Sequence, residues 1–409
     1  MQLADLLQSE RALFDGAMGT LLQSMAQQIP EGCPEALNIT DTAVVTRAHA
    51  AYAAAGSRAV ETNTLGATGE KLARTPYAGR AAELNQAAVR AARAAIGPEG
   101  VVALSIGSTG ELLAPMGPMT AERAIATYRE QVEAGFAAGA DVAYIETMMD
   151  LAEARCAGLA AGDAGKPFVI SFTFQGSATL MGNSPESCAL CAQALGACAV
   201  GINCSGGPDE LLPVLQRMRA ACALPVIVQP NAGLPEVRGD ETCYPLGPEA
   251  FADKMVPLLA AGAAGVGGCC GTTPEHIARL REKLLAFAAP PQPTTPAAMV
   301  CSGRRALPLA GVLENAYAVD ATVGEPMDAV DEALCAPREG AVLLDLSGRD
   351  AATAVQIVAE VQAMCANPLL FKLDDGAAAE AVLRAYHGVA GLLLPGSEAL
   401  CARYGAHPL

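Results

Sequence analysis

Three cysteines occupy positions where thiol ligands could meet around a metal ion. Cys269 and Cys270 are adjacent, between glycines at the end of an apolar run, in the stretch "GGCCGTTPEHI" of residues 267–277. Cys204 ends another apolar run, in "GINCS". Thiolate sulfurs hold zinc tetrahedrally, and a site with three protein ligands leaves its fourth position open, as catalytic zinc sites do. The sequence therefore predicts a zinc ion bound by these three cysteines, provided that the fold brings them together.

Glycines around the cysteine pair make adjacent ligands geometrically possible. In a regular strand neighbouring side chains point to opposite faces, so two consecutive cysteines could not both face one ion. Gly267, Gly268 and Gly271 give the backbone the freedom to bend. A pair of buried or redox-active thiols is the alternative interpretation of the Cys-Cys pair, and the third cysteine at another strand end favours the metal.

The elements that must position these residues follow one pattern. Apolar runs with strand character recur along the chain, each followed by helical sequence rich in Ala, Leu, Glu and Arg. Thr120 and Thr273-Pro274 provide helix starts. Eight such units predict an α/β fold, a closed (β/α)₈ TIM barrel with a parallel sheet. The runs are "RALFDG", "SRAVETN", "VVALSIG", "ADVAYIET", "PFVISFTF", "ACAVGINC", "LPVIVQPN" and "AAGVGGCC".

Domain boundaries follow from a change in composition. We expect the barrel to occupy residues 1–288 and the proline-rich segment after it, residues 289–305, to be an extended linker. Residues 306–409 contain three further strand candidates, "AVLLDLS", "PLLFKLD" and "VAGLLLP", separated by helical runs. These are too few to close a second barrel, so the sequence predicts a small α/β C-terminal unit.

Charge and composition exclude several classes of function. With 26 basic and 43 acidic residues the net charge is −17, and no basic stripe is present, so we expect no nucleic-acid partner. No apolar stretch reaches the roughly 18–20 residues of a membrane helix, and the N-terminus lacks signal-peptide features. We therefore expect a cytoplasmic protein without a membrane partner. In such a protein we expect many of the cysteines to be reduced core filler, namely Cys156, Cys188, Cys191, Cys198, Cys222, Cys335, Cys365 and Cys401.

Other polar residues follow the predicted strands, and the C-terminal strand ends are where a TIM barrel carries its active site. Glu146 follows a long apolar strand, where an unpaired carboxylate is costly to bury, so we expect a cationic substrate group beside it. For Asp15 a turn or cap role stays open, as does a turn role for Asn203 and Asn231. The roles of Glu61 and Asn63 stay open as well. The set comprises Asp15, Glu61, Asn63, Glu146, Asn203 and Asn231.

Six segments in this order carry a resemblance to a known family: "DGAMGT", "ETNT", "IETMMD", "GINCS", "PNAGLP" and "GGCCGTTPEHI". Together they resemble the homocysteine S-methyltransferase family, and are most similar to its homocysteine-binding module in cobalamin-dependent methionine synthases. The resemblance implies that Cys204, Cys269 and Cys270 hold Zn²⁺, with the sulfur of homocysteine as fourth ligand. It gives His276 no ligand role.

The resemblance also implies how the rest of homocysteine is held. Asp15 and Glu146 match the positions that meet its amino group. Backbone N–H groups at Gly16 and Ala17 would meet its carboxylate. Asn203 and Asn231 are then candidates for orienting the ligand shell, and Asn63 is kept as a further candidate contact.

Three functional hypotheses remain open. The first is a zinc-dependent transfer of a methyl group to homocysteine, forming methionine, from a methylcorrinoid on a separate protein. The second uses S-methylmethionine or betaine as the donor, which favours an aromatic cage. The absence of Trp and the aromatic content of 4% favour the corrinoid. The third is a non-catalytic zinc or thiol-redox barrel, in which homocysteine would change nothing at the metal.

Two features of the tail bear on the donor. The chain has no Asp-x-His-x-x-Gly signature for binding a corrinoid itself. The C-terminal unit resembles a truncated pterin-binding barrel, and we expect it to pack on the first domain or mediate association.

Overall fold

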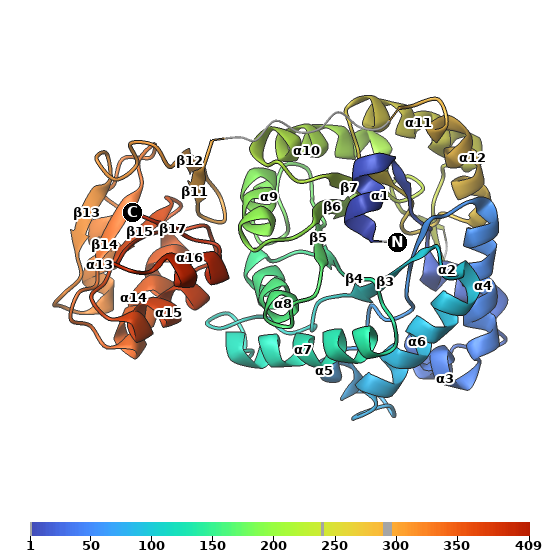
Figure 1. Cartoon of the computed structure of the whole chain (residues 1–409), viewed down its shortest axis with the longest axis horizontal. Coiled ribbons are helices and arrows are strands. Elements are labelled where there is room, and N and C mark those ends of the chain that lie inside the picture. Colours follow the sequence, from blue (N-terminus) through green and yellow to red (C-terminus); the bar gives the residue numbers. More distant parts are fainter. Residues whose placement is uncertain (1, 239–240, 289–296) are drawn as a thin grey trace.

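The computed structural model describes residues 2–238, 241–288 and 297–409, which form two α/β units (Figure 1). The larger unit is an eight-stranded parallel barrel with the strand order β1-β10-β7-β6-β5-β4-β3-β2, which confirms the predicted TIM barrel. The Arg58 N–H donates to the Leu13 carbonyl at 2.8 Å and joins β2 to β1. Each predicted run forms one strand: β1 (Ala12–Leu13), β2 (Ala59–Glu61), β3 (Val101–Ile106), β4 (Val142–Met148), β5 (Phe168–Phe172), β6 (Ala199–Asn203), β7 (Val226–Gln229) and β10 (Gly265–Val266).

Helices surround the barrel in the order of the chain, and the last, α12, packs against the first, α4, so that the outer ring also closes. Thr120 accepts a hydrogen bond from the Arg123 N–H at 3.2 Å and begins α7, as predicted. Thr273 and His276 form a capping box at the start of α12. The ring consists of α4 (Thr42–Ala55), α6 (Ala81–Ile96), α7 (Ala121–Ala137), α8 (Leu151–Asp163), α9 (Pro185–Ala194), α10 (Pro208–Ala221), α11 (Pro248–Ala260) and α12 (Pro274–Leu284). Shorter helices α2 (Met18–Met25), α3 (Leu37–Thr40) and α5 (Gly69–Leu72) lie in the loops after β1 and β2.

Apolar side chains fill the barrel interior and close one of its ends. Helix α1 (Leu3–Ser9) inserts Leu3, Leu6 and Leu7 into the cluster formed by inward-facing strand residues such as Tyr144 and Ile227. Burying each leucine contributes about 1.5–3 kcal/mol. Because α1 precedes β1 and plugs the N-terminal end of the strands, the opposite end, where the strands finish, is left for polar residues.

The C-terminal unit is an open parallel sheet of five strands in the order β13-β14-β15-β16-β17. The three predicted strands are β14 (Val342–Asp345), β15 (Leu369–Lys372) and β16 (Gly391–Leu393), so the predicted α/β unit is confirmed. Successive strands are neighbours, as they are around a (β/α) barrel, but the sheet does not close. The edge strands β13 (Tyr317–Asp320) and β17 (His407–Pro408) were not predicted, because they are short and largely exposed and so lack an apolar run. The helices are α13 (Pro326–Ala333), α14 (Ala351–Met364), α15 (Gly376–Ala385) and α16 (Glu398–Tyr404).

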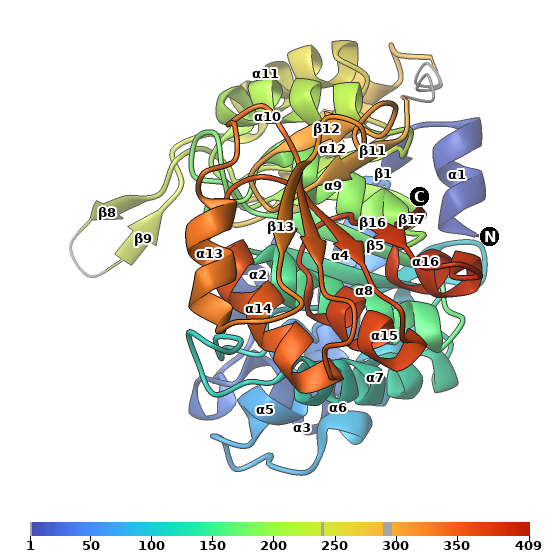
Figure 2. The same cartoon turned by 90° about the vertical axis from the view of Figure 1, so that its left-hand side faces the viewer.

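Two hairpins were not predicted. The segment proposed as a linker, residues 289–305, lies partly outside the described residues, and its later part forms strand β11 (Met299–Cys301), paired with β12 (Ala306–Pro308). Cys301 exchanges two backbone hydrogen bonds of 2.9 Å with Val389 and so joins this hairpin to the C-terminal unit. Strands β8 (Glu236–Arg238) and β9 (Glu241–Cys243) follow β7 and project from the barrel (Figure 2).

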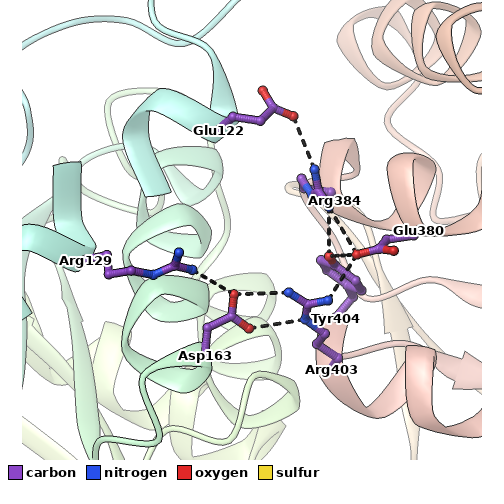
Figure 3. A network of polar contacts seen from close by, with 7 residues as sticks. All are labelled: Glu122, Arg129, Asp163, Glu380, Arg384, Arg403 and Tyr404. Carbon is purple, nitrogen blue, oxygen red and sulfur yellow. Dashed lines mark hydrogen bonds and ion pairs between the residues drawn. The ribbon is translucent and has the colours of Figure 1, made fainter. Parts of the chain in front are cut away.

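Ion pairs and hydrogen bonds tie α15 and α16 to the barrel helices α7 and α8 (Figure 3). Asp163 accepts hydrogen bonds from Nε and Nη2 of Arg403, both at 3.2 Å. Glu122 pairs with Arg384 at 3.5 Å. Because each partner is partly exposed, a single pair contributes little. The network adds to the buried contact that Leu159 of α8 makes with the core of the C-terminal unit. Its members are Glu122, Arg129, Asp163, Glu380, Arg384, Arg403 and Tyr404.

The cysteines expected in the core lie there with two exceptions. Cys198 is half-buried, and Cys335 is exposed, so the prediction for Cys335 is wrong. Cys335 directly follows the end of α13, outside the face that this helix buries. Among the described residues, no helix combines the length and the apolar character needed to cross a membrane.

Candidate active site

The three predicted cysteine ligands meet at the C-terminal end of the barrel. Cys204 directly follows β6, and Cys269 and Cys270 follow β10, the strand two places along the sheet. Their sulfur atoms all lie within 4.8 Å of one another, and the Sγ atoms of Cys204 and Cys270 are 3.7 Å apart. Zinc–sulfur bonds of about 2.3 Å at tetrahedral angles put two sulfurs about 3.8 Å apart, so this donor set fits a zinc ion.

The backbone around the cysteine pair is held by its neighbours. The Cys269 N–H donates to the Pro230 carbonyl at 2.8 Å, and the Cys270 carbonyl accepts from the Ala232 N–H at 3.0 Å. Gly271 has a φ of +80°, which is the bend that the sequence predicted. The pair is therefore fixed to the loop after β7.

Gly267 and Gly268 are needed for space rather than for bending. A Cβ atom at Gly267 would lie 2.8 Å from the Asp15 carbonyl oxygen, and one at Gly268 would lie 2.4 Å from Thr272 Oγ1. Both contacts are too close for a side chain. The glycines thus allow the strand that carries the cysteines to approach the loop after β1.

Thr272 joins the cysteine loop to the segment "DGAMGT". Its hydroxyl donates to the Cys269 carbonyl at 2.7 Å and accepts from the Ala17 N–H at 3.1 Å. A Cβ at Gly16 would lie 2.6 Å from the same hydroxyl. The Ala17 N–H, which the resemblance assigned to a substrate carboxylate, is therefore engaged by Thr272. The next N–H groups begin α2, which has no side-chain cap.

Asp15 places a carboxylate with a free acceptor in this region. Its Oδ2 accepts from the Glu61 N–H at 3.0 Å, whereas its Oδ1 is buried and has no hydrogen-bond partner among the described residues. Burial is the main cause that raises the pKa of Asp15 well above its usual range, and the nearby charge of Glu146 raises it further. A buried carboxylate without a partner is costly unless a cation arrives beside it.

Glu146 reaches the site through an irregularity in the sheet. The register between β4 and β5 shifts between Ile145 and Met148, so the chain departs from regular alternation at Glu146. Its Oε1 accepts from Ser105 Oγ at 2.5 Å and its Oε2 from Asn203 Nδ2 at 3.2 Å. Burial raises the pKa of Glu146 to about 7.

Glu61 lies beside these carboxyl groups and is partly exposed. Its Oε1 accepts from Gln229 Nε2 at 2.7 Å, and the Gln229 Oε1 accepts in turn from the Tyr144 hydroxyl at 2.5 Å. Burial is the main cause that raises the pKa of Glu61 well above its usual range, and the charges of Glu146 and Asp15 raise it further. Three carboxyl groups thus share one region of low polarity beside the cysteines.

Asn203 supports its neighbours and has no free hydrogen-bonding group. Its Oδ1 accepts from the Thr147 N–H at 3.0 Å and from Ser171 Oγ at 2.7 Å, and its Nδ2 also donates to Thr147 Oγ1 at 2.7 Å. Thr147 has a φ of +58°, an unfavourable conformation for a β-branched residue, and these bonds stabilise it.

The other two predicted asparagines differ in position. Asn231 lies with the cysteines: its Nδ2 donates to the Cys204 carbonyl at 3.2 Å, and its Oδ1 is buried without a partner among the described residues. Asn63 instead donates to the Pro34 carbonyl at 2.8 Å and to Asn38 Oδ1 at 3.0 Å. Its amide is therefore used to hold the loop before α3.

Tyr244 is a residue of the site that sequence analysis missed. Its ring covers Gly271, where a Cβ would lie 2.3 Å from Tyr244 Cγ. Hydrogen bonding with Cys204 and Cys269, and to a smaller extent with the Tyr244 hydroxyl, lowers the pKa of Cys270. Tyr244 stands in the loop after β9, and no pattern in the sequence marks it.

We expect Tyr244→Phe to weaken metal binding by about 10- to 100-fold, because removing a group that hydrogen-bonds to a metal ligand has effects of this size. The aromatic ring stays over Gly271, so the stability of the metal-free protein should hardly change. Competition with a zinc chelator measures the first quantity, and thermal unfolding the second. Equal zinc affinities would show that the hydroxyl does not support Cys270.

His276, to which the resemblance gives no ligand role, caps the start of α12. Its Nδ1 lies 2.9 Å from Thr273 Oγ1 and its Nε2 lies 2.9 Å from the Leu246 carbonyl oxygen. Both ring nitrogens are engaged in these contacts.

Comparisons with known proteins agree with this geometry. The sequence profile of the family described as homocysteine S-methyltransferase matches residues 12–284. Methionine synthases from Mycobacterium tuberculosis and Mycobacterium leprae are 34% and 33% identical over 297 and 285 residues, or 67% and 64% of this chain. These matches span only 25% and 23% of the two relatives.

Solved structures give the same result. The homocysteine methyltransferase MmuM from Escherichia coli in its oxidised form is 25% identical, has a TM-score of 0.58, and covers 69% of this chain and 98% of its own. Its metallated form is 24% identical, with a TM-score of 0.59 and coverages of 69% and 99%. The chain therefore belongs to the homocysteine S-methyltransferase family of enzymes.

Proposed function

We propose that the barrel transfers a methyl group to the sulfur of homocysteine, forming methionine, with a zinc ion held by Cys204, Cys269 and Cys270. The observation that carries this proposal is the meeting of three sulfurs within 4.8 Å, beside a buried carboxylate oxygen that has no partner in the part of the chain that the structure describes. When bound, zinc would lower the pKa of a coordinated thiol, so that a substrate sulfur in its open position is a nucleophile at neutral pH.

The chain's own residues would orient the substrate. Asp15 Oδ1 accepts from the ammonium group, and Glu146 adds a second carboxylate on the same side. The substrate carboxylate meets the N–H of Gly16 and the uncapped N-terminus of α2, where N–H groups and the helix dipole favour an anion. Asn203 holds Glu146 in place, and Asn231 orients the backbone of Cys204.

For the donor we propose a methylcorrinoid carried by a separate protein. Large apolar side chains are exposed on loops that follow different barrel strands and so surround the mouth of the barrel. Exposed apolar groups concentrated on one face favour contact with a macromolecule over a small charged donor. They are Leu65, Leu112, Met116, Met149, Leu180 and Leu234.

The deciding experiment offers homocysteine to the zinc-loaded protein together with methylcobalamin, S-methylmethionine or betaine. Methionine should form with methylcobalamin. Turnover with one of the small donors and none with methylcobalamin would overturn the corrinoid proposal. Failure with all three donors, in protein that elemental analysis shows to contain zinc, would overturn the methyltransferase proposal itself. Protein that takes up no zinc would overturn the proposed zinc site.

A further inference from the structure

A second pair of cysteines faces each other where the barrel meets the C-terminal unit. Cys191 belongs to α9 of the barrel and Cys301 to β11 of the hairpin, and their Sγ atoms lie 3.8 Å apart. Both side chains are fully buried. Because a disulfide bond is about 2.05 Å long, an approach of about 1.8 Å would join them. Neither cysteine is at the C-terminal strand ends that carry Cys204, Cys269 and Cys270.

A buried arginine supplies positive charge next to this pair. Arg155 in α8 is 3% exposed, and its Nη2 donates to the Leu383 carbonyl at 3.3 Å and the Tyr404 carbonyl at 3.1 Å, near the ends of α15 and α16. Its Nη1 is buried without a hydrogen-bond partner among the described residues. The hydrogen bond with Cys301 is the largest cause of a lowered pKa of Cys191. Burial raises this pKa and the charge of Arg155 lowers it, and the net shift is downward.

Cys188 shows that burial alone does not produce this effect. It lies in the same helix, one turn earlier, and is also fully buried. Burial raises the pKa of Cys188 well above its usual range. Cys191 therefore differs from Cys188 in its surroundings, a second thiol at 3.8 Å and the charge of Arg155, and not in its depth.

A cavity reaches Arg155, although neither Cys191 nor Cys301 lines it. It has a volume of about 310 Å³, lies between the two units, and is lined by residues that include Arg155, Gln362 and His387. The His387 carbonyl accepts from the thiol of Cys191 at 3.7 Å, so Cys191 lies directly behind this wall. Hydrogen peroxide is close to water in size, and one water takes about 30 Å³ in the liquid.

We propose that Cys191 and Cys301 are a peroxide-sensitive dithiol whose disulfide links the barrel covalently to the C-terminal unit. The Cys191 thiolate attacks one oxygen of hydrogen peroxide; an S–O bond forms, the O–O bond breaks, and the leaving hydroxide takes a proton to become water. The Cys301 thiol then loses its proton and attacks the sulfenic sulfur. An S–S bond forms, the S–O bond breaks, and a second water leaves. Two electrons pass from the sulfurs to peroxide.

Peptide mapping of the full-length protein tests this proposal. After peroxide treatment, denaturation and alkylation, a linked peptide pair containing Cys191 and Cys301 is expected. Cys191 should be lost about tenfold faster than Cys188, because Cys191 has a resolving thiol 3.8 Å away. In Cys301→Ser the link should be absent and a sulfenic acid should be trapped at Cys191 by dimedone. In the matched control Cys188→Ser the link should form as in the wild type.

The wild-type protein alone is enough to contradict the proposal. Free thiols at Cys191 and Cys301 after the cysteines of the metal site have oxidised would overturn it, as would a link from Cys191 to Cys188. Oxidised wild type should also unfold at a higher temperature than reduced, since the disulfide closes a long loop. These readouts do not depend on methyl transfer, so the proposal stands or falls independently of the proposed function.

Discussion

Cys269→Ala should leave a folded barrel that no longer retains zinc and no longer methylates homocysteine. Changing a group that merely hydrogen-bonds to a metal ligand weakens metal binding about 10- to 100-fold, so removing a ligand should cost more than 100-fold. Only the Cys204 and Cys270 sulfurs, 3.7 Å apart, would remain. The measurements are zinc content after dialysis and the rate of methionine formation.

Cys335→Ala is the matched control for this variant. Cys335 is exposed in the C-terminal unit, so its loss should change neither zinc content nor activity. Circular dichroism and thermal unfolding of both variants separate loss of the metal from loss of the fold. A Cys269→Ala protein that keeps stoichiometric zinc and full activity would contradict the three-sulfur site.

Asp15→Asn should weaken homocysteine binding without weakening the fold. A hydrogen bond to a charged group contributes about 1.5–3 kcal/mol, which corresponds to roughly a 10- to 100-fold rise in KM for homocysteine. Asn keeps an oxygen for the Glu61 N–H, so the local structure should persist. The dependence of the rate on homocysteine concentration measures the effect, with kcat changing less than KM.

The stability of this variant distinguishes a binding role from a structural one. The pKa of Asp15 is raised in the folded state, so ionising it opposes folding, and stability is lost as pH rises from its unfolded pKa through its folded pKa. Asn cannot ionise, and the variant should therefore be at least as stable as the wild type at neutral pH. Asp209→Asn, at an exposed position paired with Lys254, serves as the control. An unchanged KM together with a lower unfolding temperature would mean that Asp15 only supports the loop.

Features carried by local patterns were predictable from the sequence. The eight barrel strands are buried on both faces, so each is seen in the sequence as an apolar run between helical segments. Eight such strand–helix units in succession identify the barrel. Cys204, Cys269 and Cys270 could be assigned to one site because parallel strands bring their C-terminal ends to the same edge. The meeting of the three sulfurs could thus be predicted from the barrel topology, without knowing how the side chains pack.

Contacts that do not follow from the topology of the barrel were not predictable. The edge strands β13 and β17 and the hairpin of β11 and β12 are held by pairing with the rest of the C-terminal unit, which leaves no periodic pattern in their own residues. Tyr244 reaches Cys270 only because the loop after β9 folds back over Gly271.

For the same physical reason, residues of one type have different surroundings in the folded protein. Asn231 lies beside the cysteines while Asn63 holds a loop, and Cys191 faces Cys301 while Cys188, one turn away, does not. The sequence shows which side chains follow each strand or helix. Which atoms lie within hydrogen-bonding distance depends on how loops and helices from separate parts of the chain pack together, and only the tertiary structure decides that.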